Sequence, residues 1–111
     1  MSSGTKQDVV NLRGWAFADD PRAAAFTTKR IVSGDDVITY VTHDSSDGAW
    51  QFYGTDEFRI EDTVAVCLLH IVEKDRSVEQ LADLPLGWHA WRDDVSSPWM
   101  RSLRDEDQTQ E

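Results

Sequence analysis

The sequence has little cysteine and no long hydrophobic run. Its one cysteine, Cys67, excludes a disulfide within the chain and a metal site built from several cysteines. No apolar stretch typical of a signal peptide follows the small, polar first residues. No segment approaches the ~18 consecutive apolar residues of a membrane helix. We therefore expect a cytoplasmic protein that makes no membrane contact.

Basic residues are scarce as well. The chain has 11 Lys and Arg against 21 Asp and Glu, which gives a formal net charge of −10. Binding to nucleic-acid phosphates or to an anionic membrane needs a basic face, so both are excluded as expected partners. A basic protein partner or a cationic ligand fits this charge. The plainer alternative is that the acidity only keeps the protein soluble.

Motifs that carry chemistry are also missing. The sequence has neither a glycine-rich phosphate loop nor a nucleophile elbow. The three histidines are not paired at the spacing of metal ligands: His43, His70 and His89. His43 with Asp44 and Asp47 could hold a cation, but such an Asp-rich segment is more typical of a turn. Cys67, inside the most apolar run, is expected to be buried and unreactive. We expect no catalysis, no cofactor and no metal.

The length favours one domain over residues 1–111. A chain of this size buries roughly two thirds of its unfolded surface and needs no cross-links. Five tryptophans can supply much of a small core. We expect an ordered core over about 9–103, with flexible tails at 1–8 and 104–111.

The clearest local signal is a β-hairpin between residues 37 and 53. Residues 37–43 are rich in β-branched and aromatic side chains, a polar turn ends in Gly48, and a second aromatic segment follows over 49–53. Gly48 can take the positive φ that closes such a turn. Because side chains alternate along a strand, Trp50 and Phe52 should face the core, with Gln51 and Tyr53 on the opposite face.

The remaining segments predict an α+β fold, a mostly antiparallel β-meander of four or five strands with one short helix packed on a face. The segment 64–72 is apolar at both parities, so it is either a central strand buried on both faces or a helix. We favour the strand because it is rich in Val and Ile. The other expected elements are a helical turn or two over 21–25, a strand over 26–32, a helix over 77–84 with Ser77 as N-cap and Gln80 completing a capping box, and a strand or aromatic loop over 88–92.

An aromatic cluster near the C-terminus is the most suggestive feature for function. Trp88 and Trp91 have opposite parity in a strand, so one should pack inward and the other lie exposed. An exposed Trp beside an Arg is typical of an interface, although tryptophans can simply fill a small core. The candidate binding residues are Asp44, Asp47, Trp88, His89, Trp91, Arg92 and Trp99.

Two stretches carry a family resemblance. The first contains Ile31-Val32-Ser33-Gly34, Asp47-Gly48-Ala49-Trp50-Gln51-Phe52 and Asp56-Glu57, and the second contains His70-Ile71-Val72, Asp75 and Leu81-Ala82-Asp83-Leu84-Pro85-Leu86-Gly87-Trp88-His89-Ala90-Trp91-Arg92. Over about 26–99 the chain resembles a group of small bacterial domains of unknown function, some related to polymorphic-toxin immunity proteins. The resemblance implies a non-catalytic module that binds a toxin, and it carries over no catalytic residue.

The combined prediction is a small, acidic, non-catalytic protein-binding module of the immunity-like kind. The alternative is a domain that binds or senses a small molecule in an aromatic-lined pocket near Trp50 and Trp88. A filled core at that place would disfavour the alternative.

Overall fold

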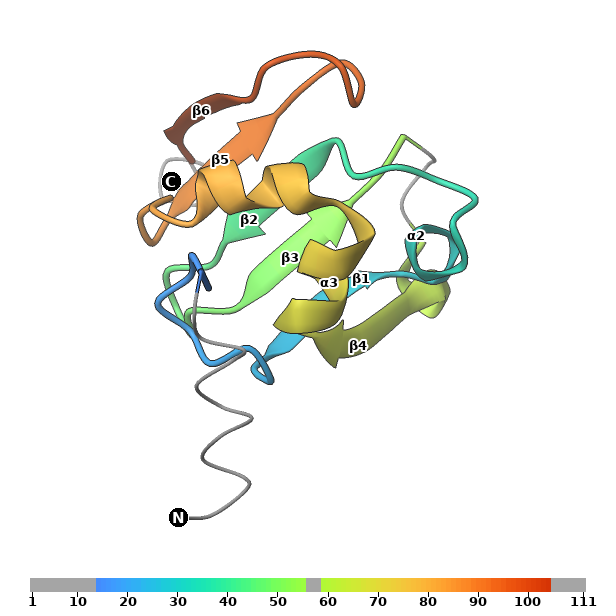
Figure 1. Cartoon of the computed structure of the whole chain (residues 1–111), viewed down its shortest axis with the longest axis horizontal. Coiled ribbons are helices and arrows are strands. Elements are labelled where there is room, and N and C mark those ends of the chain that lie inside the picture. Colours follow the sequence, from blue (N-terminus) through green and yellow to red (C-terminus); the bar gives the residue numbers. More distant parts are fainter. Residues whose placement is uncertain (1–13, 56–58, 105–111) are drawn as a thin grey trace, which may run out of the picture.

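The computed structural model describes residues 14–55 and 59–104. They form an α+β fold with six strands in one sheet, as Figure 1 shows. The elements in chain order are β1 (Ala24–Thr28), α2 (Lys29–Ser33), β2 (Tyr40–His43), β3 (Trp50–Tyr53), the 3-10 helix η1 (Ile60–Asp62), β4 (Thr63–Cys67), α3 (Leu68–Lys74), the 3-10 helix η2 (Arg76–Leu81), β5 (Trp88–Trp91) and β6 (Met100–Leu103). The predicted tail 1–8, residues 105–111 of the predicted tail 104–111, and residues 9–13 and 56–58 of the predicted core lie outside the described residues.

The strand order is β4-β1-β3-β2-β5-β6, which corrects the predicted meander. The prediction of α+β structure is confirmed, but the sheet is mixed and has six strands. β1 pairs with β3 in parallel, with Ala25 opposite Trp50, while the other neighbours pair antiparallel. A meander needs a short turn after each strand. Here the chain leaves β1 through α2 and the following loop and enters β2, which is not next to β1 in the sheet. β3 then takes the position between β1 and β2.

The hairpin between β2 and β3 is confirmed. The two strands pair antiparallel, with His43 opposite Trp50. Gly48 has a φ of 74° and donates its N–H to the Asp44 carbonyl over 2.9 Å. The positive φ is the conformation for which the turn requires glycine.

The predicted strand over 26–32 is wrong in its second half. β1 ends at Thr28, whose side chain caps α2 by accepting a hydrogen bond from the Ile31 N–H over 3.3 Å. Gly34, with a φ of 90°, ends the helix. The residues between these two caps therefore form one helical segment, although Ile and Val favour strands. The helical turn predicted over 21–25 is also wrong, because β1 already begins at Ala24.

The apolar run 64–72 is neither a whole strand nor a whole helix. It changes from β4 to α3 between Cys67 and Leu68, and β4 lies at the edge of the sheet and not at its centre. The run is apolar at both parities because a strand with one inward face continues directly into a helix with its own inward face. Cys67 ends the strand and is exposed, which corrects its predicted burial.

The helix predicted over 77–84 is the 3-10 helix η2, and its N-cap is Asp75 rather than Ser77. Asp75 Oδ1 accepts hydrogen bonds from the Ser77 N–H over 3.0 Å and from the Ser77 hydroxyl over 2.6 Å. Of the two possibilities predicted over 88–92, a strand or an aromatic loop, the structure has the strand, β5, and β6 is an additional strand.

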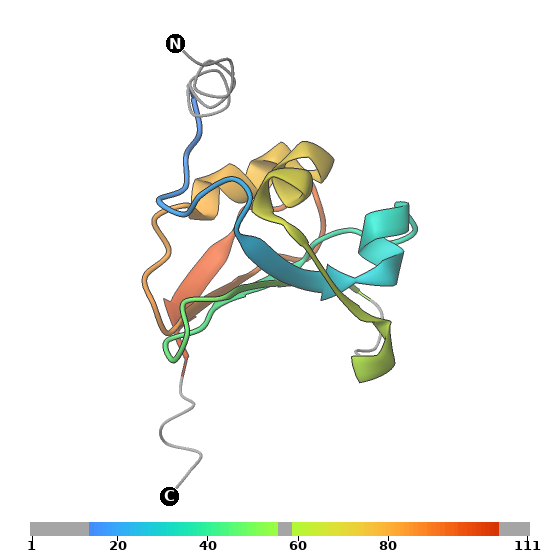
Figure 2. The same cartoon turned by 90° about the horizontal axis from the view of Figure 1, so that it is seen from below.

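The main helices cover one face of the sheet. Figure 2 shows α3 and η2 together above the strands, and no helix of the described residues lies across the opposite face. The core is formed between the sheet and these two helices. Its members include Val41, Trp50, Phe52 and Ala90 from the sheet and Leu68, Ile71, Val78 and Leu81 from the helices. This one-sided cover leaves the other face of the sheet outside the core.

Trp50 is the largest side chain in this core. It is 1% exposed, stacks on His43 with 3.9 Å between ring centroids, and meets Phe17 edge-on at 5.1 Å. Its indole N–H donates to Asp19 Oδ1 over 3.0 Å, so its one polar atom is satisfied. The prediction that Trp50 and Phe52 face the core is confirmed.

Replacing Trp50 with Ala should lower the free energy of unfolding by ~3–5 kcal/mol, the usual cost of truncating a large aromatic residue in a core. Trp91, which is 38% exposed, provides the matched control. Trp91→Ala should cost clearly less, because much of its ring already contacts water. Urea denaturation of both variants gives the two values. Equal losses would show that Trp91 is a core residue.

Candidate functional site

The face of the sheet that the described helices leave uncovered, here called the open face, is the candidate site. Because Trp50 and Phe52 point into the core, alternation and strand register place the other set of side chains on the open face. The members are Ala24, Phe26 and Thr28 of β1, Tyr40 and Thr42 of β2, Gln51 and Tyr53 of β3, Thr63, Ala65 and Cys67 of β4, His89 and Trp91 of β5, and Met100 and Ser102 of β6. None is an acidic residue, Lys or Arg, although such residues make up 29% of the chain.

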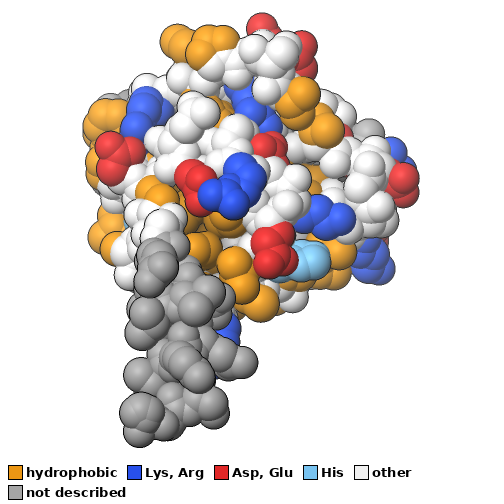
Figure 3. All heavy atoms as spheres, viewed as in Figure 1, with side chains coloured by type: hydrophobic (Ala, Val, Ile, Leu, Met, Phe, Trp, Pro, Cys, Tyr) orange, Lys and Arg blue, Asp and Glu red, His pale blue; other side chains and the backbone are white. Residues whose placement is uncertain are grey.

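The opposite face differs in character. Figure 3 looks onto the side that carries the helices, where acidic and basic side chains of both signs are distributed over the surface. Charge is therefore segregated away from the strands of the open face. This separation matters because the centre of a protein interface is depleted of charged residues.

An aromatic row crosses the open face at β2 and β5. The Tyr40 hydroxyl lies 2.8 Å from His89 Nδ1, and the two rings meet edge-on with 5.6 Å between centroids. His89 also contacts the Trp91 ring at 5.2 Å. Trp91 pairs with Tyr40 across the strands. These contacts hold three rings together on one surface before any partner arrives.

A second polar group stands beside the row on β3. The amide oxygen Oε1 of Gln51 accepts hydrogen bonds from the Thr42 hydroxyl over 3.1 Å and from the Tyr53 hydroxyl over 3.3 Å. Burial raises the pKa of Tyr53 above its ordinary value of 10.0, while the positive charge of Arg104 acts in the opposite direction. Tyr53 therefore stays a neutral hydroxyl at physiological pH, and the open face keeps its uncharged character.

The structure separates the aromatic candidates predicted from the sequence. Trp91 and His89 lie on the open face, whereas Trp88 and Trp99 pack against the core. The opposite orientation of Trp88 and Trp91 agrees with strand alternation. Arg92 is only 6% exposed, so it is an internal residue and not part of an exposed Trp/Arg surface.

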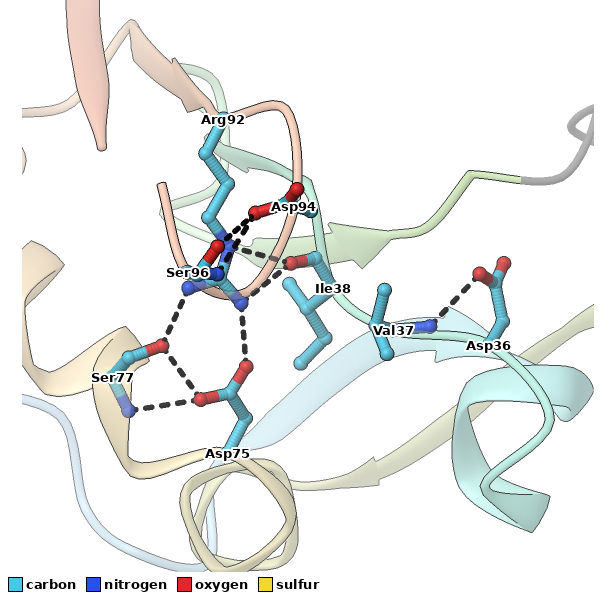
Figure 4. Close-up of polar contacts among 8 residues, drawn as sticks. All are labelled: Asp36, Val37, Ile38, Asp75, Ser77, Arg92, Asp94 and Ser96. Atoms are coloured by element: carbon cyan, nitrogen blue, oxygen red, sulfur yellow. Dashed lines mark hydrogen bonds and ion pairs between the residues drawn. The ribbon is translucent and has the colours of Figure 1, made fainter. Parts of the chain in front are cut away.

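Arg92 forms a clasp between the sheet and the helices, drawn in Figure 4. Its Nε and one terminal nitrogen donate to the Ile38 carbonyl over 3.0 and 2.8 Å. The same terminal nitrogen lies 2.6 Å from Asp75 Oδ2, and the other donates to the Ser77 hydroxyl over 2.9 Å. The guanidinium carbon lies 4.2 Å from the centre of the Trp99 ring. One buried cation thus connects β5, η2 and the segment before β2.

Asp44 and Asp47 stabilise the hairpin turn. Asp44 Oδ1 accepts from the N–H and the hydroxyl of Ser46 over 2.8 and 2.7 Å, and Asp47 Oδ1 accepts from the Ala49 N–H over 2.9 Å. The Ser46 backbone bond, followed by its hydroxyl bond, lowers the pKa of Asp44 below its ordinary 3.8. Both carboxylates therefore stabilise the turn that joins β2 to β3.

Some residues of the open face were not among the predicted site residues. Tyr40 and Phe26 are the main examples, and both are half-buried. The alternation of the hairpin already placed Gln51 and Tyr53 on this face. The missing information was that none of the described helices covers this face, which depends on how α3 and η2 pack.

The described residues show neither a metal-binding cluster nor a membrane-spanning helix. Within 14–55 and 59–104, no group of three or more His, Cys, Asp or Glu residues could hold a metal ion. None of the helices in these ranges is long and apolar enough to cross a membrane.

A hollow of about 340 Å³ lies away from the open face. It is lined by Ile31, Gly34, Asp36, Val37, Ile38, Lys74, Asp75 and Val95, none of which is aromatic. The alternative function required an aromatic-lined pocket near Trp50 and Trp88, and Trp50 instead fills the core. The hollow gives no support to that alternative, which stays a prediction.

Comparisons of the chain with protein-family models, with curated proteins and with solved structures found no match. The resemblance to immunity-type domains therefore stays a prediction from the sequence.

Replacing Asp75 with Asn should lower the free energy of unfolding by about 3 kcal/mol, because removal of one partner leaves the buried Arg92 cation without its counter-charge. Asp83→Asn is the matched control, since it breaks an Arg–Asp pair in which Asp83 is 82% exposed. Such a pair contributes ~0–1 kcal/mol. Chemical denaturation distinguishes the two. A small loss at Asp75 would mean that Arg92 does not need the carboxylate.

Asp44→Asn should destabilise the protein at neutral pH, and the difference from wild type should shrink in acid. The folded-state pKa of Asp44 is depressed, so its contribution is present above the unfolded value of 3.8 and is lost as pH falls through the folded value. Urea midpoints of both proteins at neutral pH and well below pH 3.8 measure this. A difference that stays constant with pH would contradict the assignment.

Proposed function

We propose that the protein is a non-catalytic, immunity-like binding module of the cytoplasm that binds a basic protein partner on its open face. The observation that carries the proposal is an uncovered sheet face with aromatic side chains and no charged side chain on its strands, in a chain with a net charge of −10.

The composition of the open face supports a role in protein binding. Tyr and Trp are enriched among the residues that contribute most to protein interfaces, and they work best where charged groups are absent. Trp91 is 38% exposed and is held by His89, which is in turn held by Tyr40. Pre-organised rings lose little side-chain freedom on binding, so more of the contact energy remains as affinity.

Carboxylates at the ends of the strands support a basic partner. Asp44 and Asp47 lie in the turn at one end, and Asp93 and Asp94 follow β5 at the end where Trp91 lies. Hydrogen bonds from the Ser96 side chain, then its backbone, lower the pKa of Asp94 below the ordinary 3.8, so it stays charged. Acidic groups around an uncharged centre steer a basic partner into place and raise its association rate.

The resemblance over 26–99 makes a toxin the first class of partner to try. An immunity protein acts by binding, and it needs no catalytic group of its own. A toxin reading frame beside the gene would supply the specific candidate for a direct binding measurement.

The test is affinity capture at low salt from lysate of the natural host, with wild type, Trp91→Ser and Val95→Ser as baits. Val95 is 57% exposed and lies outside the strands, so Val95→Ser is a matched loss of an exposed apolar residue. We expect one basic protein, identified by mass spectrometry, to be captured by wild type and Val95→Ser, to be reduced at least tenfold by Trp91→Ser, and to be released as salt rises.

Three results would count against the proposal. Capture that Trp91→Ser leaves unchanged would exclude the open face as the binding surface. A captured partner that is acidic, or that is retained more strongly at high salt, would contradict the charge argument. Recovery of nucleic acid in place of a protein would contradict the partner class.

A further inference from the structure

β6 is an edge strand of the sheet that the described residues form. It pairs with β5 alone among the described strands. The Arg104 N–H donates to the Gly87 carbonyl over 2.9 Å. This bond identifies which residues of β6 form backbone hydrogen bonds with β5. In an antiparallel pair, hydrogen-bonded and non-hydrogen-bonded residue pairs alternate. Ser102 therefore bonds toward β5, whereas the backbone N–H and C=O groups of Arg101 and Leu103 point away from the sheet.

Exposed apolar side chains are concentrated in the part of the chain that leads into β6 and forms it. Seven large hydrophobic residues are exposed in the described part of the chain, and five of them lie between residues 86 and 103. Two are on β6 itself, Met100 at 53% and Leu103 at 59% exposed. The other edge strand, β4, exposes the small residues Ala65 and Cys67. Covering β6 therefore removes more apolar surface from water than covering β4.

β6 also lacks the features that protect an edge strand. Natural edges are blocked by proline, by lysine or by a bulge. Met100–Leu103 contains neither proline nor lysine, and its register with β5 runs without a break. The one basic side chain of β6, Arg101, forms an ion pair with the exposed Asp83 at 2.9 Å.

We infer that β6 pairs antiparallel with β6 of a second copy and joins two sheets into one. The inference rests on the edge of the sheet and is independent of the proposed partner of the open face. We choose a second copy of the chain as the partner because β6 can pair with β6 of that copy in a symmetric register. Symmetric antiparallel pairing also closes after two copies, whereas a β4-to-β6 contact would repeat without end.

Only one symmetric register uses both outward residues and avoids like charges. If Arg101 paired with its own copy, two guanidinium groups would stand directly opposite, which is destabilising. A register centred on Leu103 would leave Arg101 opposite residue 105, outside the strand. The register centred on Ser102 pairs Arg101 with Leu103 of the second copy in both directions. The small Ser102 side chains then meet at the two-fold axis.

The joined sheet would have a defined dependence on salt. Each copy carries a net charge of −10, so the two copies repel one another at long range. Salt screens this repulsion, with a Debye length of about 10 Å at 0.1 M. Self-association should therefore strengthen as salt rises, whereas binding of a basic partner should weaken. The two salt dependences have opposite signs, so a failure of this inference can be distinguished from a failure of the proposed function.

The first experiment is sedimentation equilibrium of the full chain from micromolar to millimolar concentration, at low and high salt. Leu103→Lys should raise the dimer dissociation constant at least tenfold, because it brings a lysine opposite Arg101 of the second copy. Ile60→Lys is the matched control, since Ile60 is 77% exposed and lies outside β6. It should leave the constant within about twofold. A monomeric wild type throughout, or a dimer that Leu103→Lys leaves intact, would overturn the inference.

The second experiment tests the register by cross-linking in a Cys67→Ser background. Two cysteines at position 102 would face each other in a non-hydrogen-bonded pair with Cα atoms about 4.5 Å apart, within disulfide range. Ser102→Cys should therefore give a covalent dimer on mild oxidation. Met100→Cys is the control, because its two copies would lie about 13 Å apart along the strands. Equal cross-linking at both positions, or none at 102, would contradict the register.

Discussion

The constraint on which this structure depends is that its main helical layer covers one face of the sheet. α3 and η2 bury Trp50, Phe52 and their neighbours, and the strand alternation that sends these side chains inward sends an equal set outward. Nothing in the described helices covers the outward set. Its uncharged, aromatic composition is not explained by core packing and is the basis of the binding role that we propose.

The Arg92 clasp explains how a small domain can hold this one-sided arrangement. The cation is buried, yet each of its nitrogens finds an acceptor: the Ile38 carbonyl, the Asp75 carboxylate or the Ser77 hydroxyl. A buried charge is tolerated only when it is paired and hydrogen-bonded in this way. The clasp fixes the end of β5 against η2, so the preceding residue, Trp91, is directed to the open face by alternation.

Sequence reasoning found what local chemistry determines and missed what distant contacts determine. The hairpin, the inward orientation of Trp50 and the opposite orientations of Trp88 and Trp91 follow from turn residues and alternation, and they are confirmed. The changes from strand to helix at 28–29 and 67–68 were missed, because two adjoining apolar patterns look like one continuous run. The burial of Arg92 was also missed. Its carboxylate partner lies 17 residues earlier, and no spacing rule relates the two.

The most direct test of the open face compares identical residue types on the two sides of the sheet. Trp91 and His89 lie on the open face, and Trp50 and His43 lie on the covered one. A soluble paramagnetic reagent broadens the NMR signals of side chains that solvent can reach. The account predicts strong broadening of the Trp91 and His89 ring signals, with those of Trp50 and His43 remaining sharp. Protection of Trp91 and His89 equal to that of Trp50 and His43 would show that both faces are covered, and would contradict the account.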